Sequence, residues 1–247
     1  MRMRIAAASL AAILGICSRG HAAIINAWDF NDGRTPGGVT NFGPSPLSPG
    51  TSDANVTSSG LVRGAGLNTN LGTSSGGANA WGSRDFESGN TSAADAVADL
   101  EYSTFSVSPN AGYVLSLTSI DPYNIRRSAT GPSTGQWQYS LDGTNFTDIG
   151  SAITWGTITT GAGNPQASID LSGISALQSL AEGTTVTFRV PTWGATSSGG
   201  TWYFNTNGTA GANDLVLNGT VEAVVVPEPM SIAYLTVVGL LLSLWRR

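Results

Sequence analysis

Short segments in which apolar and polar residues alternate recur through the middle of the chain. A period of two places one side of a strand in a core and the other side toward solvent. The pattern therefore predicts half-buried strands. Six segments show it: Ile24–Phe30, Leu100–Val107, Tyr113–Ile120, Gln136–Asp142, Thr185–Val190 and Leu215–Val225.

Helical periodicity is scarce, with one short candidate at Ile174–Leu180. The 32 glycines and 11 prolines are enough to separate many short strands. Asp142 and Gly143 form a tight-turn signal, and Phe146 opens the strand that follows. Residues 35–77 have less pattern and predict long loops, with a strand near Asn55–Leu61. We therefore predict an all-β fold, an antiparallel β-sandwich of jelly-roll or lectin-like type.

The charge balance disfavours two classes of partner. The chain has 11 basic residues, all arginine, 16 acidic residues and a formal net charge of −5. Five of the arginines lie in the two terminal segments with only one of the acidic residues, so the body between them is more acidic still, at about −9. An anionic surface repels nucleic acid and anionic lipid headgroups. We expect neither as a partner.

The body also lacks the side chains of several kinds of catalysis. The single histidine, His21, and the single cysteine, Cys17, both lie near the N-terminus, and the chain has no lysine. This removes Ser-His-Asp and Cys-His nucleophiles, Schiff-base lysines, disulfides and the usual zinc sites. Glycoside hydrolysis needs two opposed carboxylates, and the few glutamates show no closely spaced pattern of that kind. We therefore expect that the protein is not an enzyme, and we keep a glycoside hydrolase as a third alternative.

The N-terminal segment is typical of an export signal. Residues 1–4 are basic, Ile5–Cys17 is apolar, and Gly20 and Ala22 are the small residues that signal peptidase reads. We expect a signal helix over 1–22, with cleavage between Ala22 and Ala23. The body then spans 23–225, about 200 residues, enough for one domain with a substantial core.

The C-terminal segment, 226–247, has three parts. Pro227, Glu228 and Pro229 form an extended knuckle, because proline cannot continue a helix. The uncharged run 230–245 would span about 24 Å as a helix, a short transmembrane segment. Arg246 and Arg247 close it as a cytoplasmic anchor.

These parts in this order resemble the sorting tail of exported PEP-CTERM proteins. The resemblance implies a Gram-negative-type bacterial host. It also implies that the tail holds the protein transiently in the inner membrane, where an exosortase recognises and removes it during delivery to the cell surface or extracellular matrix. The same tail is found on many otherwise unrelated proteins, including some ice-binding proteins, so it implies little about the body.

The body resembles the jelly-roll β-sandwich domains often found in front of this tail, for which no activity is implied. Six segments carry this resemblance: Trp28–Asn31, Arg126–Pro132, Trp137–Ile149, Ile169–Leu177, Val186–Ala195 and Asn213–Ala223.

Tryptophans and arginines suggest a carbohydrate site, because sugar rings stack on aromatic faces and sugar hydroxyls bind polar groups. Trp137 lies in an alternating strand and is predicted to be core. Trp193 and Trp202 flank a loop rich in Gly and Ser, where they could be core or sugar platforms. Arg126 and Arg127 could grip a sugar, or form structural ion pairs.

Carboxylates near the first and last predicted strands offer a second candidate site. Asp29 and Asp32 lie where the first strand ends, and Asp214 precedes the last one. If those strands are neighbours, the three side chains could bind calcium. Ordinary Asx turns are the simpler interpretation. We expect no other cofactor.

The sequence as a whole predicts a non-enzymatic exported protein of the surface or matrix, processed by signal peptidase and an exosortase and associated with exopolysaccharide or biofilm. The alternative is a lectin-like module that binds a specific glycan.

Overall fold

The computed structural model describes residues 21–31, 43–68, 80–206, 208 and 211–224, all of which belong to one compact unit, His21–Val224. The predicted transmembrane run and nearly all of the predicted signal helix lie outside these residues. Among the residues described, no helix is long and apolar enough to span a membrane.

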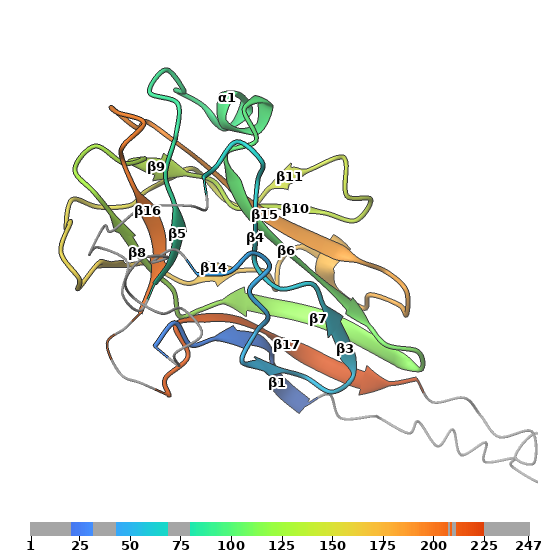
Figure 1. The fold of residues 1–247 in the computed structure, drawn as a ribbon. Coiled ribbons are helices and arrows are strands. Elements are labelled where there is room, and N and C mark those ends of the chain that lie inside the picture. The colour runs from blue at the N-terminus through green and yellow to red at the C-terminus, as the bar shows by residue number, and fades with distance from the viewer. Residues whose placement is uncertain (1–20, 32–42, 69–79, 207, 209–210, 225–247) are drawn as a thin grey trace, which may run out of the picture. The chain divides into compact units, whose positions relative to one another are not determined.

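The first and last strands lie side by side at the heart of a five-stranded sheet (Figure 1). Its order is β14 (Ile169–Asp170), β7 (Tyr113–Ile120), β17 (Leu215–Ala223), β1 (His21–Trp28) and β2 (Thr51–Ser52). All four pairings are antiparallel. The alternation predicted for β7 turns Leu115 and Leu117 into the core, where both are fully buried.

β17 bends at Gly219, where its register shifts against β7. A Cβ at this position would overlap the carbonyl oxygen of Ser116 and lie 3.0 Å from Cγ1 of Ile25. Only glycine lets the three central strands approach so closely there.

An eight-stranded sheet faces the first one (Figure 1). Its main path is β11 (Thr147–Asp148), β10 (Gln138–Ser140), β15 (Val186–Trp193), β6 (Tyr102–Pro109) and β3 (Val56–Ser58). Three short strands join its margins: β4 (Val62–Arg63), β9 (Thr134–Gly135) and β12 (Ile153–Thr154). The pairings are again antiparallel.

A four-stranded sheet closes one end of the sandwich, with the order β13 (Asn164–Pro165), β8 (Asn124–Arg127), β16 (Trp202–Asn205) and β5 (Ala80–Ser83). Within the described residues the helical elements are α1 (Ala93–Ala98) and a 3-10 turn, Ser175–Leu177. The turn falls inside the segment where the sequence predicts a short helix. Ser92 caps α1 by accepting a hydrogen bond from the Asp95 N–H.

Aromatic rings join the three sheets into one core. Trp28 on β1 meets Phe105 on β6 edge to face, with ring centroids 5.2 Å apart. Phe105 stacks on Phe188 of β15 at 5.3 Å, and Trp137 lies 6.1 Å from Phe204 of β16. Such contacts add to the burial of large apolar surfaces. The described part of the chain is therefore an antiparallel all-β sandwich, with Trp137 in its core as predicted.

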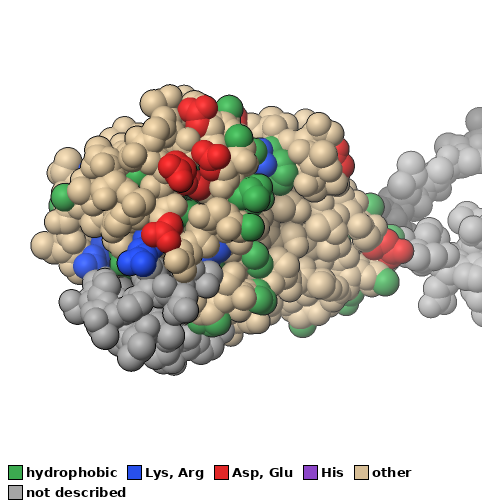
Figure 2. Space-filling view, turned by 45° about the horizontal axis from the view of Figure 1, so that its top comes forward, with side chains coloured by type: hydrophobic (Ala, Val, Ile, Leu, Met, Phe, Trp, Pro, Cys, Tyr) green, Lys and Arg blue, Asp and Glu red, His purple; other side chains and the backbone are tan. Residues whose placement is uncertain are grey.

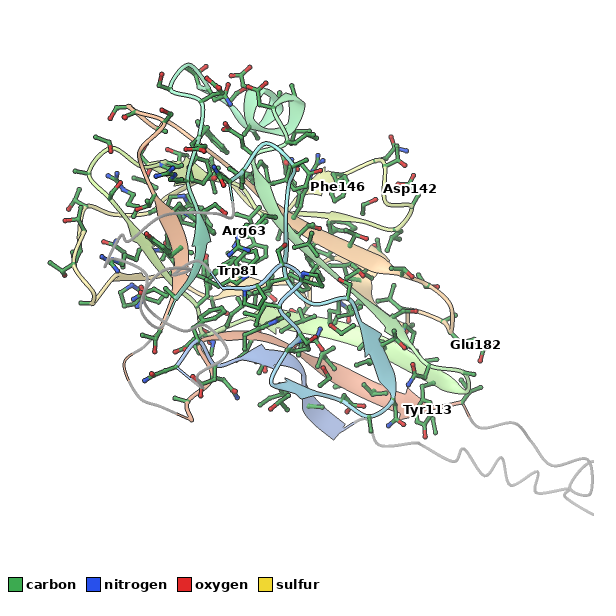
Figure 3. All side chains as sticks on the ribbon, viewed as in Figure 1. Arg63, Trp81, Tyr113, Asp142, Phe146 and Glu182 are labelled. Atoms are coloured by element: carbon green, nitrogen blue, oxygen red, sulfur yellow. The ribbon has the colours of Figure 1, made fainter. Side chains whose placement is uncertain are left out.

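A buried arginine fastens a loop to this core. Arg63 is 6% exposed, and its guanidinium lies 4.2 Å from the ring centroid of Trp81. Its Nε donates to the carbonyl of Gly82, and Nη1 donates to that of Pro44. Burial lowers the pKa of Arg63 to about 9, which leaves it charged at neutral pH. Figure 3 shows Arg63 and Trp81 side by side inside the molecule.

Candidate functional site

The outward face of the eight-stranded sheet carries the most varied chemistry among the described residues. Alternation along β15 buries Phe188 and Val190 and turns Arg189 outward. In the register of the sheet Arg189 lies opposite Gln138 of β10 and Thr104 of β6. Residues opposite each other share a face. Three neighbouring strands therefore present their polar side chains together.

Arg189 is the centre of this group. Its guanidinium lies 3.7 Å from the ring centroid of Phe146 and 5.8 Å from that of Tyr102. Its Nε donates to Oε1 of Gln138 at 2.6 Å, and Nε2 of Gln138 donates to Oδ1 of Asp148, also at 2.6 Å. We call these five residues the Arg189 cluster. Hydrogen bonds join Arg189, Gln138 and Asp148, so this part of the face is ordered before any ligand arrives.

Two opposing effects act on the pKa of Arg189 in the cluster. Partial burial holds the pKa of Arg189 below its ordinary value, and the nearby Tyr102 and Asp148 act in the opposite direction. A guanidinium remains charged at neutral pH despite such a shift. Arg189 therefore offers a fixed cation whose Nε is already bound.

The rings of the cluster are only half-buried, unlike the fully buried tryptophans of the core. The guanidinium of Arg189 lies over one face of Phe146, and the ring keeps part of its surface open to solvent. An aromatic face beside an amide, a carboxylate and a guanidinium can stack on an apolar ligand surface and bind its hydroxyls.

A hollow of about 450 Å³ adjoins the cluster. The loop between β10 and β11 supplies Leu141 and Asp142, and β15 supplies Thr187. A second hollow, of about 260 Å³, lies against Tyr139 and the same loop. Figure 3 shows Asp142 and Phe146 on this loop, which projects from the sheet.

Asp142 organises the loop. Its carboxylate accepts hydrogen bonds from the Asn145 side chain, from the backbone N–H groups of Asn145 and Thr144, and from the Ser140 hydroxyl. These bonds, led by that of the Asn145 side chain, hold the pKa of Asp142 well below its usual range. The loop therefore carries a permanent negative charge.

The structure selects the core alternative for Trp202 and gives Arg127 other partners than the sequence suggested. Trp202 is 1% exposed and lies 4.9 Å from Phe204 and 5.9 Å from Trp155, so its ring fills core and presents no face to a sugar. Arg127 donates to the carbonyls of Gly156, Ser128 and Gly131. It thus fastens loops through backbone oxygens, where the sequence suggested carboxylate partners.

The other two candidates stay open to solvent in part. Trp193 is half-buried at the end of β15, opposite Thr134. The guanidinium of Arg126 lies 5.4 Å from the ring centroid of Tyr203. Neither residue belongs to the Arg189 cluster, and their sugar-binding roles stay predictions.

The acidic residues of the first and last strands do come close, because β1 pairs with β17. Asp29 accepts hydrogen bonds from the N–H groups of Asn31 and Gly211, the first of which makes an Asx turn. Asp214 is fully buried and accepts from the N–H of Phe30. Asp32 lies outside the described residues. No group of three metal-binding side chains occurs in the part of the chain that the structure covers.

Most of the residues predicted to be recognised by signal peptidase and the exosortase lie outside the described part of the chain. Gly20, Pro227, Glu228, Pro229, Arg246 and Arg247 lie outside the described residues. Ala22 and Ala23 lie in β1, which begins at His21 opposite Val221. Cleavage after Ala22 would therefore remove the first two residues of a paired strand.

Fold and site together define an antiparallel β-sandwich with a polar, aromatic-bearing sheet face. No protein-family model matches the chain, and no curated relative matches it. Two solved structures show a distant likeness. Chitosan-binding module 1, derived from the chitosanase/glucanase of Paenibacillus sp. IK-5, has 17% identity and a TM-score of 0.24 over 66% of this chain and 94% of its own.

The second is CpGH89CBM32-5 from Clostridium perfringens, in complex with GalNAc-β-1,3-galactose. It has 13% identity and a TM-score of 0.24 over 68% of this chain and 96% of its own. Both likenesses are too distant to bear on the ligand of this chain.

Proposed function

We propose that the protein is an exported, non-catalytic carbohydrate-binding protein with a lectin-like body of jelly-roll type. The observation that carries this proposal is the half-exposed ring of Phe146, stacked on Arg189 at 3.7 Å within an ordered set of hydrogen-bonding side chains. An aromatic platform ringed by polar groups suits a sugar, which has apolar C–H faces and hydroxyl edges.

The surface is consistent with such a ligand. In Figure 2 most of the face in view is backbone and uncharged polar side chains, with the acidic and basic ones scattered among them. This composition suits binding through hydrogen bonds and ring stacking more than binding to a highly charged polymer.

A glycan array probed with the purified protein tests the proposal. We expect binding to at least one glycan, and a loss of roughly ten-fold or more in affinity for Phe146→Ala, because a buried aromatic contact is worth more than 1 kcal/mol. Tyr113→Ala is the matched control, since Tyr113 is a half-buried aromatic that lies well away from Phe146 (Figure 3). Equal binding by Phe146→Ala and the unmodified protein would contradict the site.

We also propose that the protein reaches the surface or polysaccharide matrix through its two ends. Signal peptidase would cut between Ala22 and Ala23, and an exosortase would act on the tail at residues 226–247. The support is the order Pro-Glu-Pro, apolar run, Arg-Arg. At that site the glycan-binding face would meet exopolysaccharide directly.

Alanine at Glu228 and Pro229 tests this delivery in the native host. We expect the double variant to keep its tail, since the extended knuckle is where a protease would recognise the backbone. Mass spectrometry of the surface fraction measures the retained tail. An unchanged mass would contradict the sorting role of these residues and leave the glycan proposal intact.

A further inference from the structure

We propose that the hollow beside the β10–β11 loop is a second sugar subsite, so that the ligand is an uncharged polysaccharide chain rather than a single sugar. This inference rests on the proposed carbohydrate-binding function. It adds the length and the charge class of the ligand.

The hollow and the Arg189 cluster are next to each other along one strand and one loop. Thr187 lines the hollow and lies two residues before Arg189 on β15. Residues two apart on a strand share a face at about 6.7 Å spacing. The loop that supplies Leu141 and Asp142 to the hollow continues into Phe146, which stacks on Arg189. One strand and one loop therefore connect the two places.

The hollow is lined by both apolar and hydroxyl-bearing side chains, which are the two kinds of group that bind a sugar ring. Leu141 is 43% exposed and lines the hollow, so its apolar side chain is accessible to a ligand there. Thr184, Thr185 and Thr187 line the same space, and each has a hydroxyl group that can hydrogen-bond. A leucine can cover the C–H face of a sugar while the hydroxyls hydrogen-bond its edge.

The charges in this region argue against an anionic polymer. Asp142 keeps its negative charge in the hollow, as its low pKa requires, and Asp148 lies at the cluster. Arg189 is the one cation among the residues named for the cluster and the hollow, and its Nε is bound by Gln138. The combined surface is net negative, and so is the chain at −5. Uronate or sulfate groups would be repelled.

The bound Asp142 also makes the subsite rigid. Three hydrogen bonds from its own loop and one from Ser140 at the end of β10 fix the carboxylate. A loop held in this way loses little conformational freedom on binding. Its exposed wall can therefore contribute to affinity without first having to fold.

The test is bio-layer interferometry of the full chain on immobilised polymers, in a detergent without a sugar headgroup. Two pairs each share a polymer backbone and differ in whether its substituents are charged: hydroxyethylcellulose with carboxymethylcellulose, and dextran with dextran sulfate. We expect binding to at least one uncharged member, at least ten-fold weaker binding to its charged counterpart, and little change between low and high salt, because screening acts on charge attraction. Preferred binding to a charged member would overturn the inference.

Two variants separate the subsite from the cluster. Leu141→Ala and Thr185→Val are each expected to weaken polymer binding roughly five-fold, a typical loss for one peripheral contact, about 1 kcal/mol. Ile158→Ala is the matched control, since Ile158 is an aliphatic side chain in another loop and is 48% exposed. Unchanged melting temperatures would exclude misfolding as the cause of any loss.

The outcomes distinguish the two proposals. If Phe146→Ala abolishes binding while Leu141→Ala and Thr185→Val bind as the unmodified chain does, the function stands and the second subsite is wrong. If none of the four polymers and no array glycan is bound, both proposals are wrong.

Discussion

The role of Arg189 depends on the residues that the neighbouring strand and loop place beside it. Arg189 lies between the buried Phe188 and Val190 in an alternating strand, and the sequence alone predicts only that it points outward. The register places it against Gln138, and the loop beyond β10 returns Phe146 onto its guanidinium. Stacking of arginine on an aromatic ring depends on its planar group, which lysine lacks. The cluster is thus a product of strand pairing, and spacing along the chain does not reveal it.

Glu101 shows the same dependence on context in a buried group. It is 1% exposed, and its two oxygens accept hydrogen bonds from the N–H of Glu87 and from the side chain of Asn90. Burial raises the pKa of Glu101, while those hydrogen bonds act in the opposite direction. The folded protein therefore holds this proton to a higher pH than the unfolded chain does.

The free energy of unfolding should depend on pH because of this difference in the pKa of Glu101 between the folded and unfolded protein. As pH rises from about 4.5 through the raised pKa, the unfolded chain releases the proton first, so Glu101 lowers the free energy of unfolding over that interval. Glu101→Gln should remove this slope. Urea unfolding between pH 4 and pH 7 measures it, with Glu182→Gln, a change to an exposed carboxylate, as the control. A parallel pH profile for Glu101→Gln and the unmodified protein would show that burial does not control this carboxyl.

At the scale of elements, strands with one buried face could be predicted and fully buried ones could not. The segment predicted at Tyr113–Ile120 coincides with β7, and the segment at Leu215–Val225 contains β17. β16 was missed because all four of its residues are buried, which removes the alternation on which the prediction depends. α1 was also missed, since six residues are too few to show a helical period.

The bend in β17 gives a prediction for one element. Gly219→Ala should lower the free energy of unfolding by about 1–3 kcal/mol, because the added methyl group would overlap the backbone of β7. Gly173→Ala is the matched control, since a Cβ there meets nothing within 4 Å. Chemical denaturation measures both variants. Equal stability of the two would show that the strands can separate at Gly219 without cost.

At the scale of the whole molecule, the pairing of the first and last strands could be anticipated from the fold class, and β1 lies against β17 as expected. The candidate sites could be predicted from the sequence only in part. Trp202 was one of the tryptophans considered for sugar binding, and it is buried in the core. The sequence shows that a ring is present, but it does not show which way the ring faces. The cluster on the eight-stranded sheet combines residues from four separate segments, so only the assembled sheet reveals it.

The body as a unit carries a prediction about metal. We expect Ala23–Val225, made alone, to fold as a β-type domain with the same melting midpoint in excess chelator and in millimolar calcium, because Asp29 and Asp214 already accept backbone hydrogen bonds. Circular dichroism during heating measures this. A midpoint that rises with calcium concentration would instead identify a calcium site at these carboxylates.

The place of β17 also decides how the domain bears a pull. This strand lies between β1 and β7 and is hydrogen-bonded to both, in antiparallel ladders whose bonds run across the strands. Tension applied at Val224 along the strand axis shears both ladders together, so many bonds resist at once. Tension applied between His21 and Val224, whose strands pair at the same end, would open their ladder one bond at a time. A domain that is held through its C-terminal end and pulled along the axis of β17 would be held in the stronger of these two directions.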